Sequence, residues 1–275
     1  MTGILYLVGT PIGNLGDISP RALETLRAVD FIAAEDTRVT LKLLNHFGIR
    51  KPMICYFEHN RAEMGEKLLS RLHAGESCAL VTDAGMPAIS DPGEDLVRQC
   101  AAQGIPVSAL PGPSALITAL ALSGLPTQRF CFEGFLSVNA KNRREHLEAL
   151  RTEKRTLLFY EAPHKLLRTL EDLLECLGDR PLAVCRELTK LHEEVLRTTL
   201  SGALEHFSAP DTPPRGEFVL VVGGAPEERE PEMRLEDALA LVERYMAEGL
   251  SRKEACRRAA ERSGFGKNVL YRGSV

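Results

Sequence analysis

The sequence predicts an α/β fold of two domains followed by a small helical tail. In the first half, short apolar runs alternate with segments of helical periodicity, which is the pattern of a largely parallel sheet. In the second half, two neighbouring apolar runs follow one another with no helix between them, which favours antiparallel pairing. A length of 275 residues suits two domains, and 44% hydrophobic residues can form a sizeable core.

The first domain is expected over residues 1–125. Its first strand, at residues 4–8, precedes a helix signalled by Ser19 as N-cap and Pro20 at the first helical position. The remaining elements expected in this domain are strands at 31–34, 79–81 and 107–110 and helices near 38–47 and 61–74.

The second domain is expected over residues 126–225 with an α+β arrangement. The expected strands lie at 130–135, 156–160, 182–186, 194–198 and 217–222, and the helices at 141–151, 164–177 and 201–207. An acidic, proline-flanked linker is expected at 226–234. The tail, residues 235–275, has apolar residues at helical spacing and a capping box that begins at Ser251, which predicts a helix-turn-helix-like unit.

The composition excludes several classes of protein. No run of about 18 apolar residues occurs and the first residues lack a basic signal-peptide start, so we expect a cytoplasmic protein without a membrane span. The seven cysteines include no CxxC pair and are expected to be reduced thiols. The net charge of −4 argues against a strongly basic nucleic-acid binder, but residues 245–275 carry +4, and a local basic patch matters more than the sum.

Three loops rich in glycine and proline each follow an expected strand, at residues 9–16, 83–93 and 111–115. Ligands of open α/β sheets bind beyond the carboxyl ends of the strands, and small residues let the backbone approach a ligand closely. The first loop does not fit a phosphate cradle, because its glycines have G-x₃-G-x₂-G spacing and Pro11 lacks an amide hydrogen. The loops therefore predict a pocket that recognises its ligand by backbone and shape.

Seven motifs are spread over the chain: GTPIGNLGD, AEDTR (34–38), DAGMPAISDPG, PGPSA, YEAPHK (160–165), ELTKLHEE (187–194) and KEAC…GKNVLY. Together they resemble the ribosomal RNA small subunit methyltransferase I family, of the tetrapyrrole-methylase (class III methyltransferase) fold group. The resemblance covers nearly the whole chain. It implies S-adenosylmethionine as methyl donor, 2′-O-methylation of a cytidine in the decoding region of 16S rRNA, alone or in the 30S subunit, and a homodimer. One departure is Ser137, where the family usually has a proline after Gly-Phe-Leu.

The resemblance also implies site residues. The implied donor contacts are Pro11, Gly85, Met86, Ile89, Ser114, Ala115 and, more loosely, Tyr160. The candidates for handling the hydroxyl proton are Asp36, Glu161 and Glu187, which would accept it, and Lys190, which would lower the hydroxyl pKa. The expected RNA contacts are Lys141, Arg143 and Arg144, and in the tail Arg252, Lys253, Arg257 and Arg258. Since no histidine pair has metal-ligand spacing, no metal is expected.

Each assignment has a structural alternative. Met86 and Ile89 also suit core packing, Asp36 also suits a helix cap, and an arginine-rich helix is commonly a solvated face. Two other functions are open: a methylase of the same fold that acts on a tetrapyrrole or a protein, and a non-catalytic ribosome-binding factor. The cationic tail argues against the first, and donor binding without turnover on any RNA would favour the second.

Overall fold

The computed structural model describes residues 2–226 and 233–274. Contacts divide the chain into two compact units, residues 1–225 and 226–275. Most of the acidic linker expected at 226–234 falls on residues 227–232, which lie outside the described ranges. Within those ranges, no helix combines the length and the hydropathy needed to cross a bilayer.

The first sheet is parallel throughout and has the strand order β3-β2-β4-β1-β5. Its strands are β1 (Leu5–Val8), β2 (Phe31–Ala34), β3 (Met53–Cys55), β4 (Cys78–Val81) and β5 (Val107–Leu110). Because all five strands are parallel, their carboxyl ends meet at one edge of the sheet. The three glycine- and proline-rich loops all leave from this edge.

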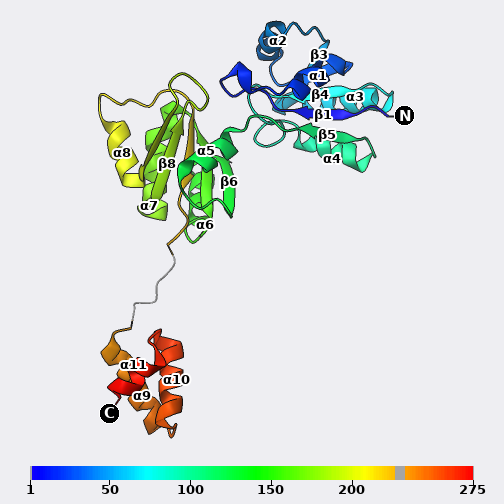
Figure 1. Cartoon of the computed structure of the whole chain (residues 1–275). Helices are drawn as coiled ribbons and strands as arrows, with labels where there is room; N and C mark the ends of the chain where they lie inside the picture. Colours follow the sequence, from blue (N-terminus) through cyan, green and yellow to red (C-terminus); the bar gives the residue numbers. More distant parts are fainter. Residues whose placement is uncertain (1, 227–232, 275) are drawn as a thin grey trace. The chain divides into compact units, whose positions relative to one another are not determined.

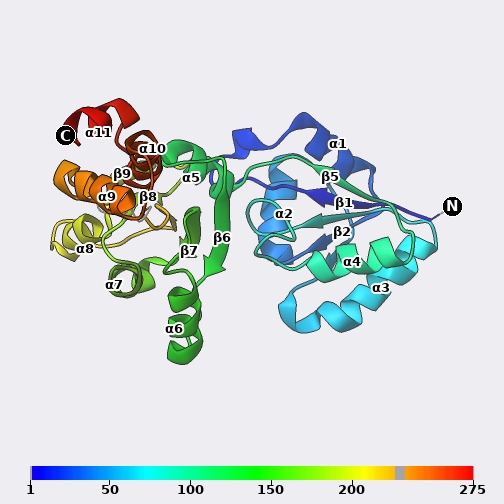
Figure 2. The ribbon, with the colours of Figure 1, turned by 90° about the horizontal axis from the view of Figure 1, so that it is seen from below.

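Helices cover both faces of the first sheet, as Figure 2 shows for α1 on one side and for α3 and α4 on the other. The helices are α1 (Pro20–Ala28), α2 (Thr37–His46), α3 (Arg61–His73) and α4 (Glu94–Ala102). In β2, Phe31 and Ala33 pack in the cluster with α3 and α4, whereas Ile32 and Ala34 pack in the cluster with α1 and α2. This burial on both faces explains the uninterrupted apolar strands.

The second sheet is mixed and has the strand order β6-β7-β10-β8-β9. Its strands are β6 (Phe130–Phe135), β7 (Thr156–Glu161), β8 (Pro181–Arg186), β9 (Glu194–Thr199) and β10 (Phe218–Val222). β6 and β7 pair in parallel, and all the other neighbours are antiparallel. The antiparallel pairing predicted for strands with no helix between them is confirmed for β8 and β9.

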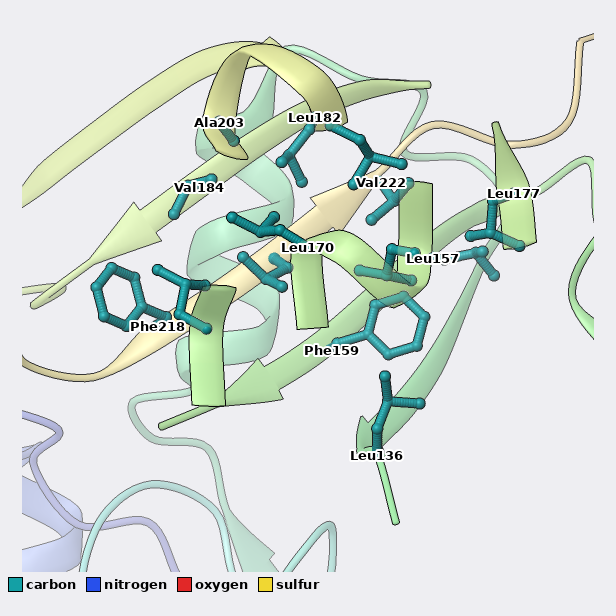
Figure 3. Packing of buried hydrophobic residues seen from close by; sticks show 14 of the residues in the cluster. Leu136, Leu157, Phe159, Leu170, Leu177, Leu182, Val184, Ala203, Phe218 and Val222 are labelled. Atoms are coloured by element: carbon teal, nitrogen blue, oxygen red, sulfur yellow. The ribbon is translucent and has the colours of Figure 1, made fainter. Parts of the chain in front are cut away.

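Helices also cover both faces of the second sheet. They are α5 (Ala115–Ser123), α6 (Ala140–Ala149), α7 (Leu166–Leu177) and α8 (Leu200–Ser208). Figure 1 shows α5 on one side of the sheet and α7 and α8 on the other. Figure 3 shows the larger core, in which Leu170 and Leu177 of α7 meet Phe159 and Val222 of the sheet. α5 precedes the expected domain boundary at residue 125, yet it packs on this second sheet.

The unit 226–275 contains three helices among its described residues: α9 (Leu235–Ala247), α10 (Arg252–Ser263) and α11 (Lys267–Gly273). Ala238, Val242 and Leu270 are fully buried in a core of its own. The side chain of Ser251 accepts the Glu254 amide at the start of α10, as predicted. The Glu254 carboxylate does not complete the capping box, because it pairs with the guanidinium of Arg257.

Candidate functional site

The loops at the carboxyl edge of the first sheet contact one another through their backbones. Thr10 and Gly85 exchange two hydrogen bonds, of 2.9 and 3.1 Å, between the loops after β1 and β4. A Cβ atom on Gly9 would lie 2.9 Å from the Cα of Gly112, in the loop after β5, and 2.7 Å from the sulfur of Met86. Gly9 and Gly112 are therefore required for the close approach of the loops after β1 and β5 to one another.

A cavity of about 300 Å³ lies between these loops and the second sheet. Six of the seven predicted donor residues line it: Gly85, Met86, Ile89, Ser114, Ala115 and Tyr160. Pro11 is not among the lining residues, and its neighbour Ile12 is. The size is at the lower end of the range usual for small-molecule sites.

The N-terminus of α5 opens into the cavity. Ser114 is its N-cap and accepts the Ile117 amide at 3.5 Å, while the Tyr160 hydroxyl accepts the Leu116 amide at 3.2 Å. Burial is the main cause that raises the pKa of Tyr160, so its hydroxyl keeps its proton. Because the hydroxyl oxygen accepts from the protein, its proton can be donated to a ligand.

Three carboxylates that were not among the predicted catalytic candidates form one side of the cavity. These carboxylates, which we call the acidic wall, belong to Glu35, Asp83 and Asp91. The Asp36 amide donates to Asp83 at 3.1 Å and the Asp83 amide approaches Glu35 at 3.4 Å, so the ends of β2 and β4 are joined here. Burial first, and then the neighbouring carboxylates, raise the pKa values of all three.

Two of the predicted proton acceptors have structural partners. Asp36 caps α2 and binds the Arg38 guanidinium, which lowers the pKa of Asp36 to about 2, and it does not line the cavity. Glu161 lines the cavity and is buried, and its carboxylate accepts the Thr169 hydroxyl and the Ala162 amide. The structural alternative foreseen for Asp36, a helix cap, is thus the role that it has here.

The other two predicted catalytic residues, Glu187 and Lys190, lie in the connection between β8 and β9. The Lys190 ammonium bridges Glu187 at 2.8 Å and Glu217 at 3.0 Å, and of these three only Glu217 lines the cavity. Burial opposes ionisation of Glu187, but hydrogen bonds from Lys190 and the Glu217 amide outweigh it and lower the pKa of Glu187. Glu187 and Thr189 both have positive φ, of 52° and 66°, a strain that frequently accompanies functional sites.

The predicted RNA contacts differ in exposure. Lys141 and Arg144 of α6 are exposed, but Arg143 is buried, where it pairs with Asp172 and donates to Thr169 at 2.8 Å. In the tail, Lys253, Arg257 and Arg258 are exposed and Arg252 is half-buried. The buried guanidinium of Arg143 is therefore unsuited to RNA contact.

No cluster of three or more potential metal ligands occurs within residues 2–226 and 233–274. The cavity is lined by carboxylates, one phenol, serine hydroxyls, a thiol and apolar surface.

A parallel sheet with ligand loops at its carboxyl edge, closed by a second mixed sheet, defines a two-domain α/β enzyme of the tetrapyrrole-methylase type. Residues 4–203 match the family described as Tetrapyrrole (Corrin/Porphyrin) Methylases. The solved uroporphyrin-III C-methyl transferase from Thermus thermophilus, complexed with S-adenyl homocysteine, superposes with a TM-score of 0.53. It is 20% identical over 80% of this chain and 97% of that one. The predicted fold class is confirmed.

More similar relatives identify the family within this fold class. The ribosomal RNA small subunit methyltransferase I of Synechocystis sp. is 51% identical over 274 residues, 99% of this chain and 98% of that protein. The protein of the same name from Thermotoga maritima is 50% identical over 222 residues, 81% of this chain and 99% of its own length. The chain belongs to the ribosomal RNA small subunit methyltransferase I family. This membership confirms the expected dependence on S-adenosylmethionine.

Proposed function

We propose that this protein transfers the methyl group of S-adenosylmethionine to the ribose 2′-oxygen of a cytidine in the decoding region of 16S rRNA. The observation that supports this most is the cavity at the carboxyl edge of the first sheet, lined by Gly85, Met86, Ile89, Ser114, Ala115 and Tyr160. Relatives that match nearly the whole chain are named as methyltransferases of small-subunit ribosomal RNA. The proposal includes a homodimer in the bacterial cytoplasm as the working form.

The residues of the cavity fit the donor. S-adenosylmethionine, when bound, supplies a methyl group on a cationic sulfonium, which is already a good leaving group. The acidic wall favours a cation, and the N-terminus of α5 favours the donor's carboxylate. Met86 and Ile89 offer apolar surface to the adenine or ribose. No phosphate cradle is needed, since the donor carries no phosphate.

The reaction needs alignment and the removal of one proton. The ribose oxygen forms a bond to the methyl carbon while the carbon–sulfur bond breaks, and the bonding electron pair stays on sulfur. Alignment can lower the barrier by roughly 7–11 kcal/mol, and a general base contributes on the order of 10²–10⁴-fold. Glu161 remains a candidate acceptor of the hydroxyl proton, with Asp36 and Glu187 as predicted alternatives and Lys190 as the group predicted to lower the hydroxyl pKa. Glu35 and Asp91 join them, because their raised pKa values make them stronger bases.

Transfer of labelled methyl to three substrates tests the proposal. The substrates are 30S subunits and protein-free 16S rRNA, both from cells lacking this protein, and a tetrapyrrole precursor. We expect label in a dinucleotide of the RNA that resists alkaline hydrolysis, since a 2′-O-methyl group blocks attack on the phosphate. Label only in the tetrapyrrole would identify a methylase of another substrate class. Donor binding with no label in any substrate would identify a non-catalytic ribosome-binding factor.

Substitution of Ser114 tests the donor site. We expect Ser114→Trp to abolish detectable donor binding in calorimetry, because the indole would fill the cavity at the start of α5. Val138→Trp is the control, since Val138 is exposed and does not line the cavity. Unchanged donor affinity in the Ser114 variant would remove the donor from this cavity.

A further inference from the structure

Phe135 is an exposed aromatic residue at the rim of the cavity. It is 58% exposed although it lines the cavity, and it is the last residue of β6. Its ring centroid lies 5.6 Å from that of Tyr160, with the ring planes at 59°. Tyr160 is itself packed edge-on against Phe132, at 5.0 Å. The Phe135 ring is therefore supported from the protein side while most of its surface is open.

The backbone before Phe135 is built to present this side chain. The pairing of β6 with β7 shifts register between Phe132 and Gly134, and Gly134 has a φ of 64°. A Cβ atom on Gly134 would meet nothing within 4 Å, so the glycine is required by its backbone conformation and not by space. Bulges of this kind occur beside active sites, where they re-aim a side chain.

Positive charge is found on the helices that follow β6 and β7. β6 and β7 run parallel, so α6 and the short helix η3 (Pro163–Lys165) with α7 both begin at the edge of the sheet where Phe135 and Tyr160 lie. The exposed Lys141 and Arg144 lie in the first five residues of α6, and the half-buried Lys165 ends η3. Helix N-termini and cationic side chains together favour phosphate groups. An open aromatic face next to such a surface suits a nucleotide whose base leaves the stack.

We propose that Phe135 is the platform on which the base of the target nucleotide stacks, with the flanking phosphates received by the first turns of α6 and α7. This inference rests on the proposed function, since it concerns the RNA substrate of the same cavity. It places the RNA on the second-sheet side of the cavity and leaves the first-sheet loops to the donor. The occupant is taken to be the base of the RNA, because the flanking phosphates suit the cationic starts of α6 and η3, which lie at the same edge of the sheet.

Steady-state kinetics test the platform with variants matched in position. Phe135→Leu keeps an apolar side chain and removes the aromatic face, Phe135→Trp keeps an aromatic face, and Val138→Ala alters another exposed apolar residue three positions further on. We expect Phe135→Leu to lower kcat/KM for 30S subunits about 5- to 150-fold, the loss of one base–aromatic stack. Phe135→Trp should lose less activity than Phe135→Leu, because it keeps an aromatic face, and Val138→Ala should keep the wild-type value. Full activity of Phe135→Leu, or no rescue by Phe135→Trp, would overturn the inference.

A binding measurement separates this inference from the proposed reaction. The chain has no tryptophan, so Phe135→Trp and Val138→Trp each carry a single tryptophan, which can be excited selectively over the tyrosines. Bound protein-free 16S rRNA should quench the emission of the Phe135→Trp variant and leave that of Val138→Trp unchanged. Quenching by S-adenosylhomocysteine alone would place adenine on the ring and overturn the inference, as would bound RNA without quenching. Quenching by RNA in a protein that labels no RNA would retain the platform and reject the proposed reaction.

Discussion

At the scale of single residues, the acidic wall opposes folding at neutral pH. Burial and mutual repulsion raise the pKa values of Glu35, Asp83 and Asp91, so the folded chain resists their ionisation. Groups kept in such an environment commonly serve a site at the expense of stability. Asp36, directly after Glu35, shows the opposite case, since Arg38 favours its charged form.

Asp91→Asn and Asp36→Asn should change stability in opposite directions. For Asp91 the folded pKa lies above the unfolded value of about 3.9. Its ionisation therefore destabilises the folded chain: this cost is absent below the unfolded pKa and complete above the folded pKa. Asp91→Asn should therefore stabilise the folded chain at pH 7, and this gain in stability should vanish below about pH 4.

For Asp36, with a folded pKa of about 2, the stabilisation from its charged form is present above the unfolded pKa and is lost as pH falls towards 2. Asp36→Asn should therefore destabilise at pH 7. Urea midpoints between pH 3 and 8 measure both, and a shift of the same sign at pH 7 would contradict this assignment.

Two glycines give a second prediction, in which the same substitution has opposite effects. A Cβ atom on Gly112 would lie 2.9 Å from the Cα of Gly9, so Gly112→Ala should cost about 1–3 kcal/mol and weaken donor binding. Gly65 lies inside α3, where a Cβ atom would meet nothing within 4 Å, and Gly65→Ala should stabilise by about 0.5–1 kcal/mol. Denaturant midpoints measure the change in stability, and calorimetry measures the change in donor affinity. Equal effects of the two substitutions would show that contact between the loops is not why a glycine is needed at position 112.

At the scale of elements, the sequence predicts strands best where turn residues bound them. The predicted ranges 31–34, 107–110 and 130–135 coincide with β2, β5 and β6. β3, α4 and α5 are not predicted, each for a physical reason. β3 has only three residues, α4 begins behind Gly93 in a positive-φ conformation, and α5 is apolar all round, so it lacks helical periodicity.

The site was predictable to the extent that it is local in sequence. The donor loops follow single strands and can be recognised from their glycines and prolines, with the resemblance naming the residues. The acidic wall depends on β2 and β4 being neighbours in the sheet, an order that spacing along the chain does not contain. The exposure of Phe135 depends on a register shift against β7, and the burial of Arg143 depends on Asp172 in another helix.

Helix α10 gives a prediction about the tail. Arg257 pairs with both Glu254 and Glu261, whereas the guanidinium of Arg258 lies 5.6 Å from the centroid of the Tyr245 ring. Arg258→Glu should therefore weaken RNA binding more than Arg257→Glu. Loss of one phosphate contact should lower the slope of log affinity against log salt by about 0.7–0.9. An unchanged slope in both variants would leave α10 as a solvated face.

At the scale of the whole molecule, the chain consists of two units with separate cores. The relative from Thermotoga maritima matches over 222 residues, nearly its full length, which is close to the 225 residues of the first unit. A chain that ends at Ala225 should therefore fold and keep its donor affinity, because the cavity is formed by residues of the first unit alone. Its affinity for RNA should fall and depend less on salt, since the basic helices are removed. Calorimetry with donor and filter binding with RNA measure the two effects. Loss of donor binding in a folded truncated chain would show that the tail contributes to the site.

The backbone contacts among the loops after β1, β4 and β5 have a consequence for redesign. Gly9 meets Gly112, and Thr10 is bonded to Gly85, so the position of each loop depends on the other two. A chimera that takes one of these loops from a distant methylase would bring a backbone shaped for different neighbours. A working donor site should therefore be transferred between such enzymes only when all three loops are transplanted together.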